Sequence, residues 1–164
     1  MVSSNEQASV AFDALYRDTV RDLYAYVMTI VRDQQTAEDV THTAYERAYR
    51  KQRSFRESRG SQRAWLFGIA RNAALDELRR KKRTASLLDD IPDEDPSSPD
   101  DPILRTVVRS ALAALDARDR ELIALKFYAG LSHREIADVV GISESNAGTA
   151  LHRALKRLRE ACDA

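Results

Sequence analysis

The sequence predicts an all-α protein in which two small helical domains are joined by a flexible acidic linker. Apolar residues recur at three- and four-residue steps along most of the chain, which is the period of an amphipathic helix. The period stops between residues 84 and 101, where prolines, serines and acidic residues gather. Such a segment buries too little apolar surface to offset the entropy of ordering it. The 164 residues, 43% of them hydrophobic, suffice for one compact domain or two small ones, and the linker favours two.

The first predicted domain covers residues 1–84. Its three helices are expected at about residues 10–32, 36–50 and 62–82. The loop at residues 51–61 places one aromatic residue, Phe55, among four cations. This mixture suits single-stranded nucleic acid, because cations follow the phosphates and a ring or pocket receives an unstacked base. Phe55 could instead fill the local core, and the sequence leaves both interpretations open.

The second predicted domain covers residues 102–164 and follows a linker at residues 85–101. Its first helix is expected to begin at Pro102, because proline suits the first turn of a helix. Asp116 is expected to cap the next helix. The four short helices expected here need mutual packing to be stable.

Residues 131–160 read as two helices with a tight turn between them. Gly141 interrupts the apolar stripe of the first helix, and Ser143 can cap the second, since its hydroxyl accepts a hydrogen bond from a free backbone N–H. This is the pattern of a helix-turn-helix unit, whose second helix enters the major groove of DNA. An ordinary helical hairpin gives a similar pattern, so DNA binding does not follow from this motif alone.

Charge is distributed unevenly along the chain, although the formal net charge is zero. Residues 47–83 hold thirteen basic residues and three acids, whereas residues 86–101 hold seven acids and no base. A polyanion responds to the local potential within roughly 8–10 Å. A basic face can therefore bind nucleic acid in a protein that is neutral as a whole.

Several classes of protein are excluded by what the sequence lacks. No apolar run approaches the roughly 18 residues of a membrane helix, and the first residues do not form a secretory signal, so a cytoplasmic protein without membrane insertion is expected. One cysteine and three scattered histidines make no metal cluster, and no cofactor is expected. The chain has no glycine-rich phosphate loop and no nucleophile–base pair, so we do not expect an enzyme.

Two blocks of sequence carry a family likeness, in matching order and spacing. AEDVTHTAYERAYR and AWLFGIARNAALDELRRKKR precede the acidic linker, and LDARDRELIALKFYAGLSHREIADVVGIS and LHRALKRLRE follow it. Together they resemble bacterial RNA polymerase sigma factors of the extracytoplasmic-function (ECF, group IV) type, from about residue 12 to residue 160. The resemblance implies that residues 1–84 are sigma region 2, which binds core polymerase and reads and melts the minus-10 element. It implies that residues 102–164 are sigma region 4, which reads the minus-35 element.

The same resemblance implies partners and site residues. The partners would be core RNA polymerase, through its β′ clamp helices and β flap, promoter DNA, and an anti-sigma factor. By position, the core-polymerase contacts would be Asp39, His42, Thr43, Glu46 and Arg47. The minus-10 contacts would be Arg53, Phe55, Arg63, Arg71, Asn72, Asp76, Arg79 and Arg80. The minus-35 contacts would be Ser132, His133, Arg134, Ser145, Asn146, Thr149, His152, Arg153 and Lys156.

One position and one five-residue segment depart from the family's usual pattern. His42 stands where the family usually has glutamine, so its contact with the clamp helices is expected to differ. Many members begin the recognition helix with threonine-valine-lysine-serine-arginine, but residues 146–150 here are Asn-Ala-Gly-Thr-Ala. Two cations are missing, and Gly148 costs about 1 kcal/mol of helix propensity. We therefore expect an unusual minus-35 sequence and weaker phosphate binding through this helix.

The alternative function is a stand-alone helix-turn-helix regulator, which would bind duplex DNA without core polymerase. The arginine-rich third helix and its phenylalanine-containing loop argue against that alternative, because a duplex-binding regulator has no need of them.

Overall fold

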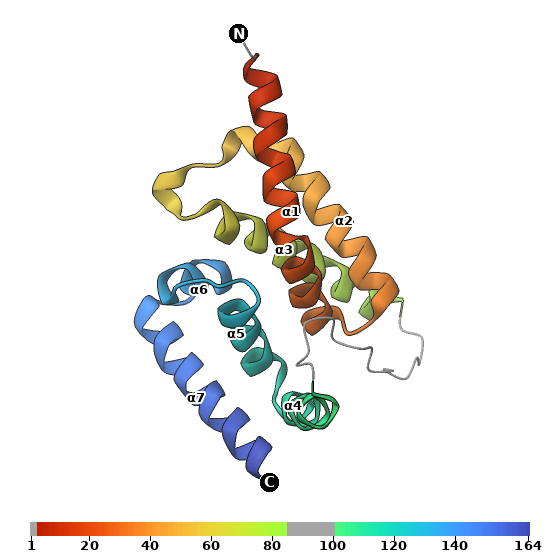
Figure 1. The fold of residues 1–164 in the computed structure, drawn as a ribbon, viewed down its shortest axis with the longest axis vertical. Coiled ribbons are helices and arrows are strands. Elements are labelled where there is room, and N and C mark those ends of the chain that lie inside the picture. Colours follow the sequence, from red (N-terminus) through yellow and green to blue (C-terminus); the bar gives the residue numbers. More distant parts are fainter. Residues whose placement is uncertain (1–2, 85–100) are drawn as a thin grey trace.

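The computed structural model describes residues 3–84 and 101–164, and all regular structure within these two stretches is helical (Figure 1). The all-α class predicted from the sequence is therefore confirmed. The elements in chain order are α1 (Ser4–Val31), α2 (Gln34–Lys51), the short 3-10 turns η1 (Gln52–Ser54) and η2 (Glu57–Arg59), α3 (Gln62–Arg83), α4 (Pro102–Ala114), α5 (Ala117–Phe127), α6 (His133–Val140) and α7 (Glu144–Asp163). The predicted acidic linker lies outside the described residues, apart from its last residue, Asp101.

Short polar side chains set where the helices begin. Ser61, Asp116 and Ser143 each accept a hydrogen bond from the backbone N–H three residues on, at the starts of α3, α5 and α7. Ser3 and Glu6 form a reciprocal capping box, so α1 begins at residue 4 rather than near residue 10 as its apolar period predicts. These caps satisfy backbone donors that helix geometry leaves without a partner.

Helices α1, α2 and α3 form a three-helix bundle. Leu23 and Tyr26 of α1 and Phe67 of α3 are fully buried, and the centroids of the Tyr26 and Phe67 rings lie 5.4 Å apart. Helix α2 contributes mainly small buried residues, such as Ala37 and Ala44, to the same core. Small side chains at these positions allow close helix packing.

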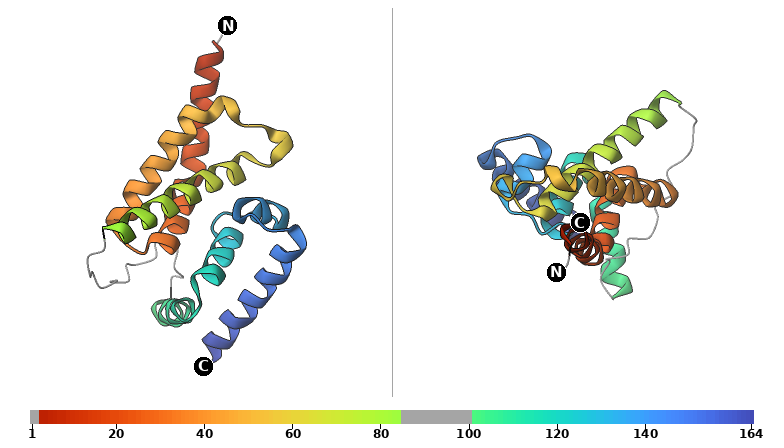
Figure 2. Two further views of the ribbon diagram at one scale, coloured as in Figure 1. Left: turned by 180° about the vertical axis from the view of Figure 1, so that it is seen from behind. Right: turned by 90° about the horizontal axis from the view of Figure 1, so that it is seen from above.

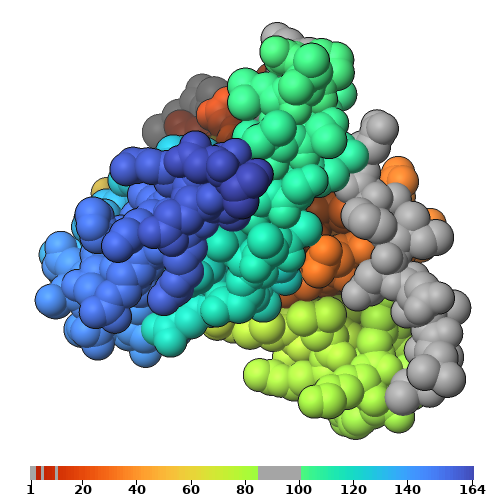
Figure 3. Space-filling model, turned by 90° about the horizontal axis from the view of Figure 1, so that it is seen from below, coloured from red at the N-terminus to blue at the C-terminus, as the bar shows by residue number. Residues whose placement is uncertain are grey.

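Helices α4 to α7 form the second helical unit. Helices α6 and α7 make the expected helix-turn-helix, with Gly141 ending α6 in the left-handed conformation at φ 78°. A hydrogen-bonded ion pair of 2.6 Å between Asp119, which is buried, and Arg157 ties the start of α5 to α7. Seen from below, α4 and α7 lie side by side, and the end of α3 projects beyond them (Figure 3).

The two helical units pack directly on one another. Helix α5 lies against α1, and α6 lies against α3 (Figures 1 and 2). The buried apolar residues of the two units form one continuous core. Among the residues that the structure describes, no helix is long and apolar enough to cross a membrane. No group of three or more metal-ligating side chains occurs in the same residues.

Candidate protein and nucleic-acid interfaces

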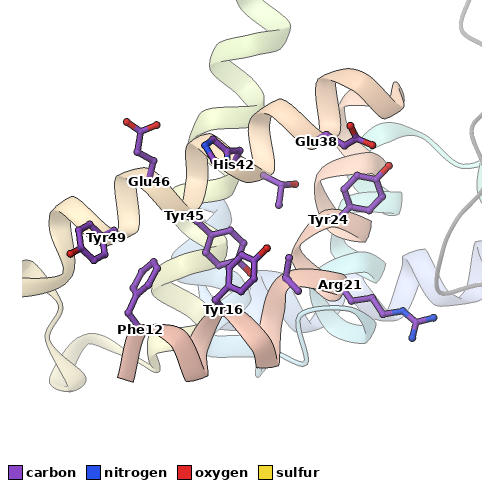
Figure 4. Close-up of a pocket in the computed structure, with 11 residues that line it drawn as sticks. Phe12, Tyr16, Arg21, Tyr24, Glu38, His42, Tyr45, Glu46 and Tyr49 are labelled. Atoms are coloured by element: carbon purple, nitrogen blue, oxygen red, sulfur yellow. The ribbon is translucent and has the colours of Figure 1, made fainter. Parts of the chain in front are cut away.

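An apolar groove of about 750 Å³ runs between α1 and α2 (Figure 4). Aromatic rings form much of it, with the Tyr16 and Tyr45 centroids 4.7 Å apart and those of Phe12 and Tyr49 5.3 Å apart. Two of these rings remain open to solvent, since Tyr16 is 45% and Tyr49 53% exposed. The residues that line the groove are Phe12, Tyr16, Val20, Arg21, Tyr24, Glu38, Thr41, His42, Tyr45, Glu46 and Tyr49.

The floor of this groove is held by a buried chain of hydroxyl groups. The Thr19 hydroxyl donates to the Leu15 carbonyl at 2.6 Å, so the Tyr45 hydroxyl, 2.7 Å away, is the donor to Thr19. Burial raises the pKa of Tyr45 to about 12, which keeps this phenol protonated and able to donate. The hydroxyl chain therefore ties the Tyr45 ring of α2 to α1 beneath the groove.

The predicted polymerase-binding residues divide between two faces of α2. His42 and Glu46 line the groove, and Asp39 is exposed nearby on the same helix. Thr43 and Arg47 are half-buried, and Arg47 forms an ion pair of 3.5 Å with Asp76 of α3. A surface that combines aromatic rings with carboxylates suits a protein helix better than it suits DNA.

Phe55 packs against the bundle instead of projecting into solvent. Its ring centroid lies 5.5 Å from that of Trp65, and the side chain is half-buried. The Arg56 guanidinium donates to the carbonyls of Arg53 and Phe55, which fixes the loop. The structure therefore favours the interpretation of Phe55 as a packing residue in this form of the protein, while Arg53 stays exposed.

The eight predicted minus-10 residues do not form one surface. Two lie in the loop, and Arg63 and Arg71 face the second helical unit. The other four are exposed on α3: Asn72, Asp76, Arg79 and Arg80. Asp76 lies 3.4 Å from Arg79, and Arg80 donates to both oxygens of Glu77. The hydrogen bonds from Arg80 lower the pKa of Glu77, which stays ionised beside the basic end of α3.

Arg63 binds protein acceptors where the two helical units meet. Its Nη2 atom donates to Asp22 at 2.7 Å and to the Tyr128 carbonyl at 2.9 Å, and its Nε atom donates to the Ala129 carbonyl. The guanidinium carbon also lies 5.4 Å from the centroid of the Phe67 ring. In this arrangement protein atoms accept hydrogen bonds from its Nε and Nη2 atoms, and the contact of Arg63 with DNA stays a prediction.

Arg71 also binds the second helical unit, through Glu121, which the sequence analysis did not identify as a site residue. Its Nε atom donates to Glu121 of α5 at 2.5 Å, and the same carboxylate oxygen accepts from the Tyr26 hydroxyl at 2.9 Å. Glu121 is separated from these partners by 50 and 95 positions. The acidic Glu121 within the apolar run of α5 is only a weak sequence signal of a contact between helices. It does not show which residues Glu121 binds.

Most of the predicted minus-35 residues share one side of α7. Six of them are exposed along one side of α7: Ser145, Asn146, Thr149, His152, Arg153 and Lys156. Ala147, Leu151 and Ala154 are buried on the opposite side. This is the arrangement of a recognition helix that leaves one face free for the major groove.

The start of α6 adds to this face. His133 and Arg134 are exposed, whereas the Ser132 hydroxyl is engaged in a capping box with Glu135. His133 also lies close to the glycine in α7, because a Cβ atom at position 148 would lie 3.2 Å from the His133 Nδ1 atom. Gly148 makes room for this imidazole, which helix propensity alone could not reveal.

Glu135 also reaches the first helical unit, where its carboxylate accepts a hydrogen bond from the Ser61 hydroxyl. Burial alone would raise the pKa of Glu135, but hydrogen bonds from Ser61 and Ser132 lower it overall. A capping residue of the helix-turn-helix is therefore also a contact to the start of α3.

A helix-turn-helix with a free recognition face, joined to a basic helical bundle with an apolar groove, defines a DNA-binding protein that also docks on another protein. Two family models match the chain: Sigma-70 region 2 at residues 15–84 and Sigma-70, region 4 at residues 105–158. The ECF RNA polymerase sigma factor SigL of Mycobacterium tuberculosis (strain ATCC 25618 / H37Rv) is 32% identical over 151 residues, covering 89% of this chain and 85% of SigL. SigX of Bacillus subtilis (strain 168) is 32% identical over 160 residues, covering 91% and 82%.

Solved structures give the same result for the fold. CnrH in complex with the cytosolic domain of CnrY is similar with a TM-score of 0.69 at 26% identity, covering 96% of this chain and 93% of that one. RpoE in complex with the anti-sigma factor NepR from Bartonella quintana has a TM-score of 0.78 at 23% identity, covering 94% and 98%. The chain belongs to the ECF RNA polymerase sigma factors. It is a non-enzymatic factor that directs promoter-specific transcription by core RNA polymerase, and a stand-alone regulator is not favoured.

Proposed function

We propose that the two helical units divide promoter recognition, with residues 1–84 binding core polymerase and minus-10 DNA and residues 102–164 reading the minus-35 duplex. The main support for this proposal is the exposed polar face of α7. Its polar side chains recur at helical spacing opposite a buried apolar side, which is what insertion into the major groove requires. Asn146 and Arg153 have the chemistry to read base edges, and Lys156 suits phosphate.

The groove between α1 and α2 is the proposed site for the clamp helices of core polymerase. Its rings supply apolar contact area, while His42, Glu46 and the nearby Asp39 supply polar contacts around it. Thr43 and Arg47 are half-buried, and Arg47 pairs with Asp76 of α3. Arg47 would therefore orient α2 more than it would touch the polymerase.

Two further features belong to the same proposal. We infer a cytoplasmic location, since core polymerase and promoter DNA are found there. We also infer control by an anti-sigma factor, since the similar RpoE structure is a complex with the anti-sigma factor NepR. No cofactor has a part in the proposed function.

Reconstitution with core RNA polymerase tests the proposal. The chain should co-elute with core polymerase in gel filtration and direct run-off transcription from a subset of genomic fragments. The double substitution His42→Ala with Glu46→Ala should weaken co-elution, whereas Arg17→Ala, at an exposed position of α1 outside the groove, should not. Duplex binding without any binding to core polymerase would instead support the stand-alone regulator.

A further inference from the structure

We propose that Arg47 of α2 binds DNA rather than core polymerase, as one half of a phosphate-binding pair with Arg79 of α3. The inference rests on the proposed minus-10 surface and extends that surface from α3 onto α2. Its ligand is the phosphodiester backbone of the DNA, not a base.

Arg47 points away from the groove that is proposed for the polymerase. Helical residues four positions apart share a face, whereas adjacent residues point about 100° apart. His42 and Glu46 are four apart and line the groove, while Arg47, the next residue, reaches α3 instead. Helix α3 packs against α2 at this side. The position of Arg47 therefore connects it with the residues of α3 that are predicted to meet DNA.

A single carboxylate, that of Asp76, joins Arg47 to Arg79. The Nη1 atom of Arg47 donates to Oδ2 of Asp76 at 3.5 Å, and the Nη1 atom of Arg79 donates to Oδ1 at 3.4 Å. Two guanidinium groups from two helices thus converge on one anionic group with two oxygens. A phosphodiester offers arginine the same chemistry through its two non-bridging oxygens.

The contacts with Asp76 are weak enough to yield to a phosphate. The side chains of Arg47, Asp76 and Arg79 are 39%, 54% and 68% exposed, respectively. Ion pairs this open to water contribute little to stability, because solvent screens them. Both distances also exceed the roughly 2.7–2.9 Å of a strong charge-assisted hydrogen bond. Asp76 can therefore keep the two arginines near one another without competing strongly with DNA.

The surroundings of the pair are cationic. Lys82 and Arg83 are exposed in the last turn of α3, and Arg83 lies on the same side of the helix as Arg79, four positions before it. Such a surface attracts the phosphates of a nucleic acid. An acidic protein helix would be attracted by the same charges, so the test must separate DNA from polymerase.

Arg47→Ala and Arg47→Lys in the full chain test the assignment. Lysine keeps the positive charge but lacks the planar fork of a guanidinium, so it should restore only part of the binding. Arg17→Ala, at an exposed position of α1, makes the same change in net charge as Arg47→Ala and serves as the control. Thermal melts by circular dichroism should show that all three variants fold.

Two affinities are measured for each protein. One is for a fluorescent single-stranded DNA 20-mer of mixed sequence at several salt concentrations, and the other is for core RNA polymerase. Arg47→Ala should weaken DNA binding about fivefold and reduce the slope of log K against log salt concentration by about 0.7, with a smaller loss for Arg47→Lys. Binding to core polymerase should not change in either variant, and Arg17→Ala should change neither affinity.

The Asp76→Asn background distinguishes a direct contact from an indirect one. Loss of Arg47 leaves the Asp76 carboxylate with one partner fewer, and that charge alone could repel DNA. In the Asp76→Asn background this charge is absent, so Arg47→Ala should still weaken DNA binding if the guanidinium touches phosphate. If the effect disappears there, Arg47 acts only by neutralising Asp76, and the phosphate-binding pair is wrong.

Weaker binding of Arg47→Ala to core polymerase would return this residue to the polymerase surface and overturn the proposal, whatever its affinity for DNA. DNA binding no weaker than in the Arg17→Ala control would overturn it as well, as would an unsubstituted chain that does not bind the 20-mer at low salt. Failure of the proposed function is visible separately, because the unsubstituted chain would then fail to bind core polymerase and to direct run-off transcription.

Discussion

Replacing Gly148 with alanine should stabilise this protein, and by less than helix propensity alone predicts. An interior helical glycine costs about 1 kcal/mol relative to alanine. The new Cβ atom would lie 3.2 Å from the His133 Nδ1 atom, closer than an ordinary contact of 3.4–4 Å. Because the His133 ring is exposed, it can move by the few tenths of an ångström required. We expect a net gain of about 0.5 kcal/mol in the free energy of unfolding, which corresponds to roughly 1–2 °C in Tm.

A double-mutant cycle with His133→Ala isolates the effect of the ring. In the His133→Ala background the Cβ atom has no imidazole to displace, so Gly148→Ala should recover the full gain of about 1 kcal/mol. Urea unfolding of the four proteins measures the difference. If Gly148→Ala changes the free energy of unfolding equally in both backgrounds, then the His133 ring does not oppose the added Cβ atom.

Four further substitutions test other parts of the structure. Tyr45→Phe should lower the free energy of unfolding by about 1–2 kcal/mol in urea melts, because it leaves the buried Thr19 hydroxyl without its donor; a neutral effect would refute the buried hydroxyl chain. Hydrogen bonds to its carboxylate lower the pKa of Asp33, so its stabilisation is present above the unfolded-state pKa and is lost as the pH falls through the folded-state value. Asp33→Asn should therefore destabilise the protein at pH 7 more than at pH 3, and equal losses would count against this linkage. Arg153→Ala should weaken binding of the minus-35 duplex by about 1–3 kcal/mol and relax the preference at one base pair. Lys156→Ala should weaken binding to all sequences alike and reduce the salt dependence of binding. Titrations at several salt concentrations measure both effects, and they would show the reverse if the roles of the two residues are exchanged.

Local features of the fold could be predicted from the sequence because they depend on residues near one another. Asp116, Ser143 and Gly141 cap helices as their chemistry predicts. The exposed face of α7 follows from the helical period alone. Ser3 was missed as a cap because few apolar residues follow it closely enough to reveal the period.

The contacts between the two units could not be predicted in this way. Arg71 and Glu121 are 50 positions apart, and isolated charged residues are expected to be solvated rather than paired. The family resemblance assigned Arg63 and Arg71 to DNA because it compares positions, not conformations. Their protein partners depend on how α5 and α6 pack on the bundle, and only the three-dimensional arrangement supplies that information.

The continuous apolar core that joins the two units makes their association sensitive to temperature. Separating the units would expose apolar surface to water, and such exposure carries a positive heat-capacity change. Hydrophobic association weakens on cooling. The packing of the two units should therefore weaken in the cold without any change in sequence or ligand.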